Sequence, residues 1–125
     1  MKYVRCYADS GGESHFEELE IDFQESAADA DGDVPARAAP IPGGDVQFIR
    51  NKPGFFRDWH PTPYSWIGTI VQGRVEVTAS DGESRVFGPG DVHVHEDETG
   101  KGHQTRVIGD ETAVLMRTRL QAPLG

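Results

Sequence analysis

Turn signals recur along this chain every few residues, and they constrain its fold more than any other feature of the sequence. Between them apolar and polar residues alternate with a period of two, as in Arg74-Val75-Glu76-Val77-Thr78, and no stretch has a convincing period of 3.6. Asp81-Gly82 predicts a hairpin with a type I′ turn, because both central positions of that turn need positive φ. The 15 glycines and 8 prolines suit many short strands better than long helices. The sequence therefore predicts an all-β sandwich or barrel.

The strands expected from this alternation cover most of the chain. Asp81-Gly82, Gly88-Pro89-Gly90-Asp91 and Gly109-Asp110 separate those of its second half. The expected strands are Lys2–Ala8, Phe16–Phe23, Val46–Arg50, Ile67–Gln72, Arg74–Thr78, Arg85–Phe87, Val92–His95, His103–Ile108 and Ala113–Leu120.

The length of 125 residues predicts one domain, residues 1–125, with a single core. Residues 26–44 are rich in Ala, Asp, Gly and Pro and have too few large apolar side chains to offset the entropy of ordering, so they are predicted to form a surface loop. Cys6 is the only cysteine, which excludes a disulfide within the chain.

The acidic composition bears on partners and location. A formal net charge of −9 argues against nucleic acid, whose phosphates need a basic face, and against an anionic membrane surface. No apolar run approaches the ~20 residues that cross a bilayer, and the first residues do not resemble a signal sequence. We expect a soluble, cytoplasmic protein with neither nucleic-acid nor membrane partners.

The segment between His60 and His103 carries two motifs that resemble those of the cupin superfamily. Ile70-Val71-Gln72-Gly73 looks like the strand and glycine that close the first cupin motif, and Gly88-Pro89-Gly90-Asp91 followed by His103 looks like the second. The chain is similar in particular to small, poorly characterised cupins with Trp-His before the first motif, here Trp59-His60. These also carry an Asp-x-Thr-Gly-x-Gly-His string, here Asp97 to His103. The resemblance implies a double-stranded β-helix (jelly-roll) barrel, often dimeric, with one site inside.

The same comparison of motifs locates the expected ligands. We count back from Gly73, the glycine that closes the first motif. The position of its first histidine is then His60, that of its second histidine is Thr62, and that of its glutamate is Trp66. The third histidine, which belongs to the second motif, corresponds to His103. Two of the four usual metal ligands are thus present. His60 and His103 are the expected metal-binding or catalytic pair, since neutral imidazole serves both roles. Glu96 is the expected third ligand or acid/base group, because it lies on the same strand face as Val92 and Val94.

Three further features complete the expected site. His93 and His95 share a strand face, and we expect this face to point outward or toward a partner subunit, because the intervening valines are better core residues. Inward-facing histidines would add two ligands. The glycines before His103 permit a tight turn that Asp97 and Thr99 would cap. Trp59, Thr62, Tyr64 and Trp66 are expected to line the substrate pocket, alongside Phe55 and Phe56, which we interpret as barrel plugs.

The sequence leaves several functions open. The first is an enzyme of isomerase or lyase type that acts on a compact organic acid or carbonyl compound, with a divalent metal (Zn, Ni, Mn or Fe) held by His60, His103 and Glu96 or with no metal. The second is a non-catalytic metabolite-binding or sensor cupin, and a third is an interaction protein with a vestigial pocket. Oxygen chemistry is less expected, because it usually needs three protein ligands around iron. We expect a small-molecule ligand and a homodimer.

Overall fold

The computed structural model describes all residues from 1 to 125 and contains strands but no helix. Accordingly, no helix is long and apolar enough to cross a membrane. The strands are β1 (Lys2–Ala8), β2 (Ser14–Glu20), β3 (Gln24–Glu25), β4 (Ala36–Arg37), β5 (Gly43–Asn51), β6 (Phe56–His60), β7 (Trp66–Gln72), β8 (Arg74–Ala79), β9 (Ser84–Phe87), β10 (Val92–Glu96), β11 (His103–Ile108) and β12 (Ala113–Leu120).

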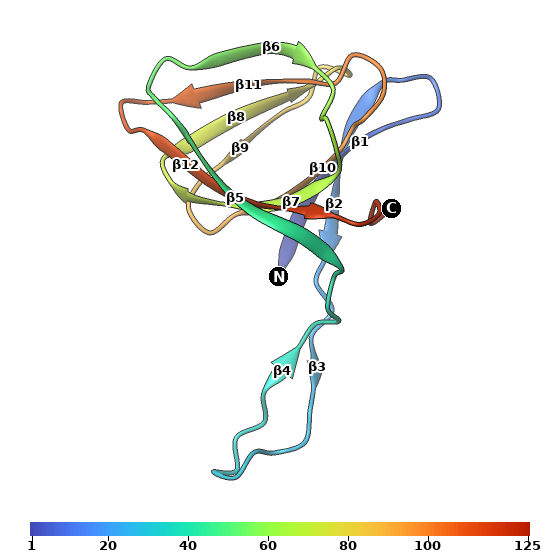
Figure 1. Cartoon of the computed structure of the whole chain (residues 1–125), viewed down its shortest axis with the longest axis vertical. Helices are drawn as coiled ribbons and strands as arrows, with labels where there is room; N and C mark the ends of the chain where they lie inside the picture. The colour runs from blue at the N-terminus through green and yellow to red at the C-terminus, as the bar shows by residue number, and fades with distance from the viewer.

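Two sheets face each other and form a jelly-roll barrel, as Figure 1 shows. The larger sheet has the order β2-β1-β10-β7-β12-β5, and the smaller has the order β6-β11-β8-β9. All pairings between neighbouring strands are antiparallel except that of β1 with β10, two segments far apart in the sequence that pair in parallel. The all-β jelly-roll prediction is confirmed.

The apolar core lies between the two sheets and is small. It consists of side chains that alternate inward along β7, β8, β9, β11 and β12, as the period of two in the sequence predicts. Its buried members are Ile70, Val75, Val77, Phe87, Val107 and Ala113. This cluster leaves part of the space between the sheets unfilled, and that space is the site described below.

The β8–β9 hairpin has a different turn from the one that Asp81-Gly82 predicts. Gly82 has a φ of +96°, but no residue other than glycine has a positive φ, so Asp81 does not adopt the type I′ conformation. The amide of Gly82 donates to the carbonyl of Ala79, and the amide of Ala79 donates to the carbonyl of Glu83. The loop is longer than a two-residue hairpin, and only its glycine needs the left-handed region.

Residues 26–42 lie outside the barrel, whereas Gly43 and Gly44, the last two residues of the predicted loop, begin β5. Together with β3 they form a narrow two-stranded arm that projects from the barrel (Figure 1). Almost all residues from Asp22 to Phe48 are exposed. The arm joins β2 to β5, which are the two outermost strands of the larger sheet.

Candidate functional site

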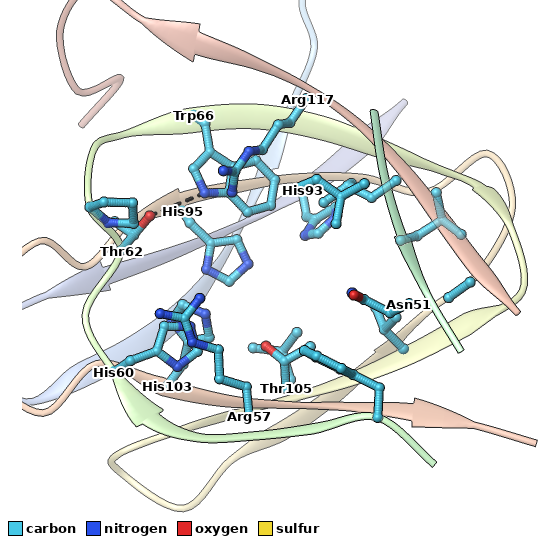
Figure 2. A pocket seen from close by; sticks show the side chains of 18 residues that line it. Asn51, Arg57, His60, Thr62, Trp66, His93, His95, His103, Thr105 and Arg117 are labelled. Atoms are coloured by element: carbon cyan, nitrogen blue, oxygen red, sulfur yellow. Dashed lines mark hydrogen bonds between the residues drawn. The ribbon is translucent and has the colours of Figure 1, made fainter. Parts of the chain in front are cut away.

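A cavity of about 210 Å³ lies between the two sheets, and it is lined from both (Figure 2). Its deeper walls are aliphatic, and its polar lining consists of histidines, threonines, two arginines and an asparagine. Cavities of this composition and size suit compact ligands better than drug-sized ones. The lining residues are Ile49, Asn51, Phe55, Arg57, His60, Thr62, Pro63, Trp66, Ile70, Val75, Val77, His93, His95, His103, Thr105, Ala113, Leu115 and Arg117.

His93 and His95 on β10 point into this cavity, so the expectation that they face outward is wrong. Both are buried, with 3% and 2% of their surface exposed, but Val94 between them is buried as well. β10 lies in the middle of the larger sheet, and both of its faces are covered. The preference of valine for the interior therefore could not identify the inner face.

The inward histidines are uncharged. Burial is the main reason that the pKa of His95 falls to about 4, with the nearby His103 as a second cause. Burial likewise lowers the pKa of His93 well below its usual value. His95 stacks on the indole of Trp66 with ring centres 4.6 Å apart, and His93 stacks on Phe87 at 4.5 Å. Neither ring nitrogen of His93 has a hydrogen-bond partner within the protein.

Asp97 is fully buried and holds His103. Nδ1 of His103 donates to Oδ2 of Asp97 at 2.5 Å, and Nδ1 of His95 lies 3.5 Å from the other carboxylate oxygen. Burial opposes ionisation of Asp97, but the two imidazoles outweigh this and hold its pKa well below the usual range. Asp97 therefore has more than the capping role that its sequence position suggested.

The turn that returns the chain to His103 depends on Gly102. This glycine has a φ of +76°, and a Cβ at this position would lie 1.9 Å from the carbonyl oxygen of His60. Only glycine permits this close passage of two backbone segments. The passage brings His103 on β11 into register with His60 on β6, so the two functional residues expected from the motifs are adjacent.

His60 and His103 have ring centres 4.5 Å apart, and His95 lies 4.3 Å from His103 on its other side. Nδ1 of His60 donates to the carbonyl of Asp58 at 2.7 Å, which leaves Nε2 as the free acceptor. Burial, more than any charged neighbour, lowers the pKa of His60. Three imidazoles thus lie side by side at one wall of the cavity (Figure 2).

Thr62 and Trp66 replace the usual second histidine and glutamate, and they bond to each other instead. Nε1 of Trp66 donates to Oγ1 of Thr62 at 3.1 Å, and that hydroxyl donates to the carbonyl of Tyr64 at 2.9 Å. Both side chains are buried and line the cavity, as expected for pocket residues. Their hydrogen bonds occupy the groups that would otherwise face a ligand.

Glu96, Trp59 and Tyr64 lie away from the cavity, unlike the sequence expectation. Glu96 shares a face with Val94, and because His95 faces inward, this face is the outer one. There Glu96 accepts from Arg5 at 2.8 Å and from the amide of Leu124. Trp59 packs against Lys101, whose Nζ lies 4.2 Å from the ring centre. Tyr64 accepts from Arg117 at the edge of the site.

Phe55 and Phe56 also differ from each other. Phe55 lines the cavity and packs against the core, as a barrel plug would. Phe56 is 47% exposed and lies under Arg106 on the outside. The plug interpretation therefore holds for Phe55 alone.

The sequence analysis missed the contribution of β1. Because β1 pairs in parallel with β10, Cys6 is in register with His95 and faces the same side. Cys6 is buried, and burial together with nearby carboxylates raises the pKa of its thiol well above the usual range. Cys6, His95, Asp97 and His103 form a cluster whose potential ligand atoms all lie within 4.8 Å of one another. Strand pairing between the two ends of the chain leaves no local sequence signal.

Two arginines give the cavity lining a positive charge. Arg57 is exposed, while Arg117 donates to Gln47 and Tyr64 and lies 5.3 Å from the ring of Trp66. Both side chains line the cavity, and Figure 2 shows Arg117 on the side of Trp66 and Arg57 on the side of His60. An arginine can hold a carboxylate through two parallel hydrogen bonds. Chemically, the site combines carboxylate-binding groups with adjacent proton-transfer groups.

Comparisons with known proteins agree with this geometry. No family model matches the sequence. The sequence is 38% identical over 77 residues to the cupin-domain-containing oxidoreductase srdB of Neurospora crassa. These residues are 61% of this chain but only 38% of that protein, so the chain spans well under half of its relative.

One solved structure shows the same fold. The cupin domain of Schizosaccharomyces pombe Cnp3 matches 97% of this chain and 88% of its own, with a TM-score of 0.53 and 13% identity. A cupin 2 domain-containing protein from Halorhodospira halophila covers 98% of this chain and 83% of its own, with a TM-score of 0.49 and 17% identity. The fold assignment depends on the first of these. The facing sheets and their internal cavity have the fold of that cupin domain, and the aligned part of the sequence is similar to a cupin-domain-containing protein.

Proposed function

We propose that this protein is a small-molecule cupin enzyme of isomerase or lyase type that acts on a compact organic acid or carbonyl compound in the barrel cavity. The observation that carries the proposal is the pairing of buried Asp97 with His103 directly beside His60. Two imidazoles with different hydrogen-bond partners, at the wall of one small cavity, are suited to give and take protons on the same substrate.

The hydrogen-bond partners of His60 and His103 indicate which of them is the base and which is the acid. His60 donates its Nδ1 proton to a backbone carbonyl and keeps a free Nε2, so it is the base. A carboxylate bonded to one ring nitrogen stabilises the imidazolium that forms, so His103 with Asp97 is the acid. His60 would remove a proton from the carbon next to a carbonyl. His103 would donate one either to another carbon, giving isomerisation, or to a departing group, giving elimination.

The rest of the cavity supports a compact acidic ligand. Arg57 and Arg117 supply donors for a carboxylate, and the two nitrogens of His93 have no partner within the protein. The aliphatic walls leave a volume of about 210 Å³, which is enough for a small metabolite but not for a nucleotide. A buried polar atom without a partner is costly, so a bound ligand or water would satisfy His93.

The usual cupin metal set does not fit these residues. Within that set only His60 and His103 supply nitrogens, whereas an open catalytic site usually has three protein ligands; the inward-facing His93 and His95 add imidazoles at other positions. Of the other usual positions, Thr62 is bonded to Trp66 and Tyr64, and Trp66 offers only an N–H donor. Glu96 faces Arg5 outside the cavity. No step of the proposed reaction therefore passes through zinc, nickel, manganese or iron at these positions.

Solvent deuterium exchange tests the proposal without knowledge of the product. Small 2-oxo acids, unsaturated acids and hydroxy acids would be incubated with the protein in D₂O, and loss of carbon-bound protons would be followed by NMR. An active compound should exchange or convert with wild-type protein and not with His60→Gln or His103→Gln. His15→Gln is the matched control, because His15 bonds to Asp9 and Asp81 outside the cavity.

The outcomes of this experiment separate the alternatives. Exchange that persists in both cavity variants would overturn the assigned roles. Compounds that shift the NMR signals of the protein but show neither exchange nor conversion would favour a non-catalytic binding or sensor cupin instead.

The sequence relative favours a second candidate function. The protein from Neurospora crassa is described as an oxidoreductase, and 61% of this chain aligns with it at 38% identity. We propose oxidoreduction as the alternative activity of the same cavity. Oxygen uptake or reduction of an added quinone or nicotinamide acceptor, in the presence of the same acids, would distinguish it from proton transfer.

A further inference from the structure

The buried cluster of Cys6, His95, Asp97 and His103 lies at the wall of the cavity. In the proposed proton transfer it has no role beyond the pairing of Asp97 with His103. We infer that Cys6, His95, Asp97 and His103 form a metal-binding site for zinc or a similar borderline-soft divalent cation. This set shares only His103 with the usual cupin positions, and its thiol and carboxylate come from positions that the motifs do not predict. The site shares Asp97 and His103 with the proposed function, but metal binding is measured without any catalytic activity, so either proposal can fail alone.

The arrangement of the four side chains is the first argument. They come from β1, from β10 and its end, and from the start of β11, and their potential ligand atoms all lie within 4.8 Å of one another. Ligand atoms of a tetrahedral zinc site are roughly 3.5 Å apart, given bonds of about 2.0–2.3 Å. An ion would therefore need to draw the group inward by about an ångström, which side-chain rotations can supply.

Unsatisfied buried atoms are the second argument. Oδ1 of Asp97 and Nδ1 of His95 have no hydrogen-bond partner, although Asp97 is fully buried and His95 is 2% exposed. The two atoms are 3.5 Å apart, too far for a hydrogen bond, and both lie on the Asp97 side of the cluster. A cation between them would satisfy both, whereas an empty cluster leaves two desolvated polar atoms unpaired.

Charge and ligand type are the third argument. A thiolate and a carboxylate with two neutral imidazoles carry a formal charge of −2, which a divalent ion neutralises within a buried site. Thiolate and imidazole ligands select zinc over magnesium or calcium, which prefer oxygen. All four residues are at most 5% exposed, so the site is closed, as structural zinc sites are.

The inferred site is compatible with proton donation by His103. An ion on the Asp97 side would take the place of the proton on Nδ1 of His103, and that ring would carry its proton on Nε2. Nε2–H would then be the donor, in place of the imidazolium that Asp97 stabilises in the metal-free site, and His60 is not part of the cluster. His95 would be fixed by the ion as well as by its stacking on Trp66.

Metal titration of the untagged, chelator-stripped full chain tests the inference. Zinc stoichiometry after dialysis should approach one per chain, and cobalt substitution should produce the charge-transfer absorption of a cobalt–thiolate bond. Cys6→Ser should abolish that absorption. Cys6→Ser and Asp97→Asn should each weaken zinc binding by more than roughly 100-fold, the upper end of the loss for an outer-shell partner. His60→Gln and His93→Gln are matched controls that should bind within about twofold of wild type.

The contrary results are equally specific. Wild-type protein that retains no zinc or cobalt would overturn the inference. Metal binding that survives Cys6→Ser but is lost in His60→Gln would also overturn it, because it would place the ion on the cavity side. Circular dichroism of each variant verifies that it is folded, and Cys6→Ser is nearly isosteric, so one variant stays informative even if Asp97→Asn unfolds.

Discussion

Asp97 and His103 are joined by a buried hydrogen bond of 2.5 Å across the turn that begins at Glu96 and ends at β11. The bond exists because this turn passes directly beneath the carbonyl of His60 at Gly102. One glycine therefore determines the relative positions of three groups on which the candidate site depends.

Gly102→Ala should destabilise the protein severely. A methyl group would lie 1.9 Å from a backbone oxygen at a φ of +76°, and neither backbone segment can move without displacing a site histidine. Gly109→Ala is the matched control, since Gly109 has a φ of +79° but open space around it. We expect the control to cost about 1 kcal/mol and Gly102→Ala to cost several times as much. Urea unfolding of both variants measures the difference, and equal losses would contradict the account.

In chelator-stripped, metal-free protein the free energy of unfolding should fall as the pH is lowered from about 6.5 to 4. His95 has a pKa of about 4 when folded and about 6.5 when unfolded, so between these values the unfolded chain binds the extra proton. Stability is therefore present above the unfolded pKa and is lost as the pH falls, with a contribution from His95 on the order of 3 kcal/mol. Buried His93 acts in the same direction.

Urea unfolding at several pH values between 7 and 4 would measure this dependence. His95→Gln should remove much of the slope, because glutamine does not titrate. A wild-type profile that stays flat over this range would show that His95 is accessible to protons in the folded state.

Thr62→Val should cost about 1–3 kcal/mol, because it leaves the buried N–H of Trp66 without an acceptor. Trp66→Phe removes that donor, so adding Thr62→Val to it should cost much less than Thr62→Val alone. A double-mutant cycle in urea gives this coupling. Additive losses would mean that the hydrogen bond between the two side chains contributes nothing to stability.

Arg57→Gln should weaken the binding of a carboxylate ligand identified in the exchange experiment by roughly 10- to 100-fold, the usual range for a charge-assisted hydrogen bond. Arg57 is exposed, so protein stability should barely change. Arg106→Gln is the matched control, because Arg106 follows Thr105 on β11 but lies over Phe56 outside the cavity. Isothermal titration calorimetry measures both, and equal effects would exclude a direct contact with Arg57.

We propose that the homodimer expected from the cupin resemblance forms through β5. This strand is an unpaired edge of the larger sheet, and it exposes Val46 and Phe48 at 59% and 65%. Apolar edge strands are seldom left uncovered. Sedimentation velocity should show a dimer that Phe48→Glu converts to a monomer, whereas Val86→Glu on β9 should leave it intact. A monomeric wild-type chain would contradict the proposal.

The sequence predicted the barrel well, because strand alternation and turn residues are local signals. It also brought His60 and His103 together, since the cupin motifs fix their spacing in the fold. It failed at β10, where Val94 and His95 are both buried because each face of the strand is covered. The amide of Leu124 bonds to Glu96 on the outer face, a contact between distant segments that no pattern within β10 could reveal. Because the inner and outer faces of β10 were interchanged, the sequence analysis also placed Glu96 in the cavity and did not predict that His95 lies beside Cys6.

The parallel pairing of β1 with β10 also has a consequence for the order of folding. Cys6 leaves the ribosome before His95, with which it is paired, and all of β2 to β9 is synthesised between them. β1 can form its hairpin with β2 early, whereas the pairing with β10 requires closure of a long loop and is therefore slow. Until β10 is synthesised, Cys6 lies on a strand with one unpaired edge. The metal-binding cluster of Cys6, His95, Asp97 and His103 is complete only when β10 and β11 have joined the barrel.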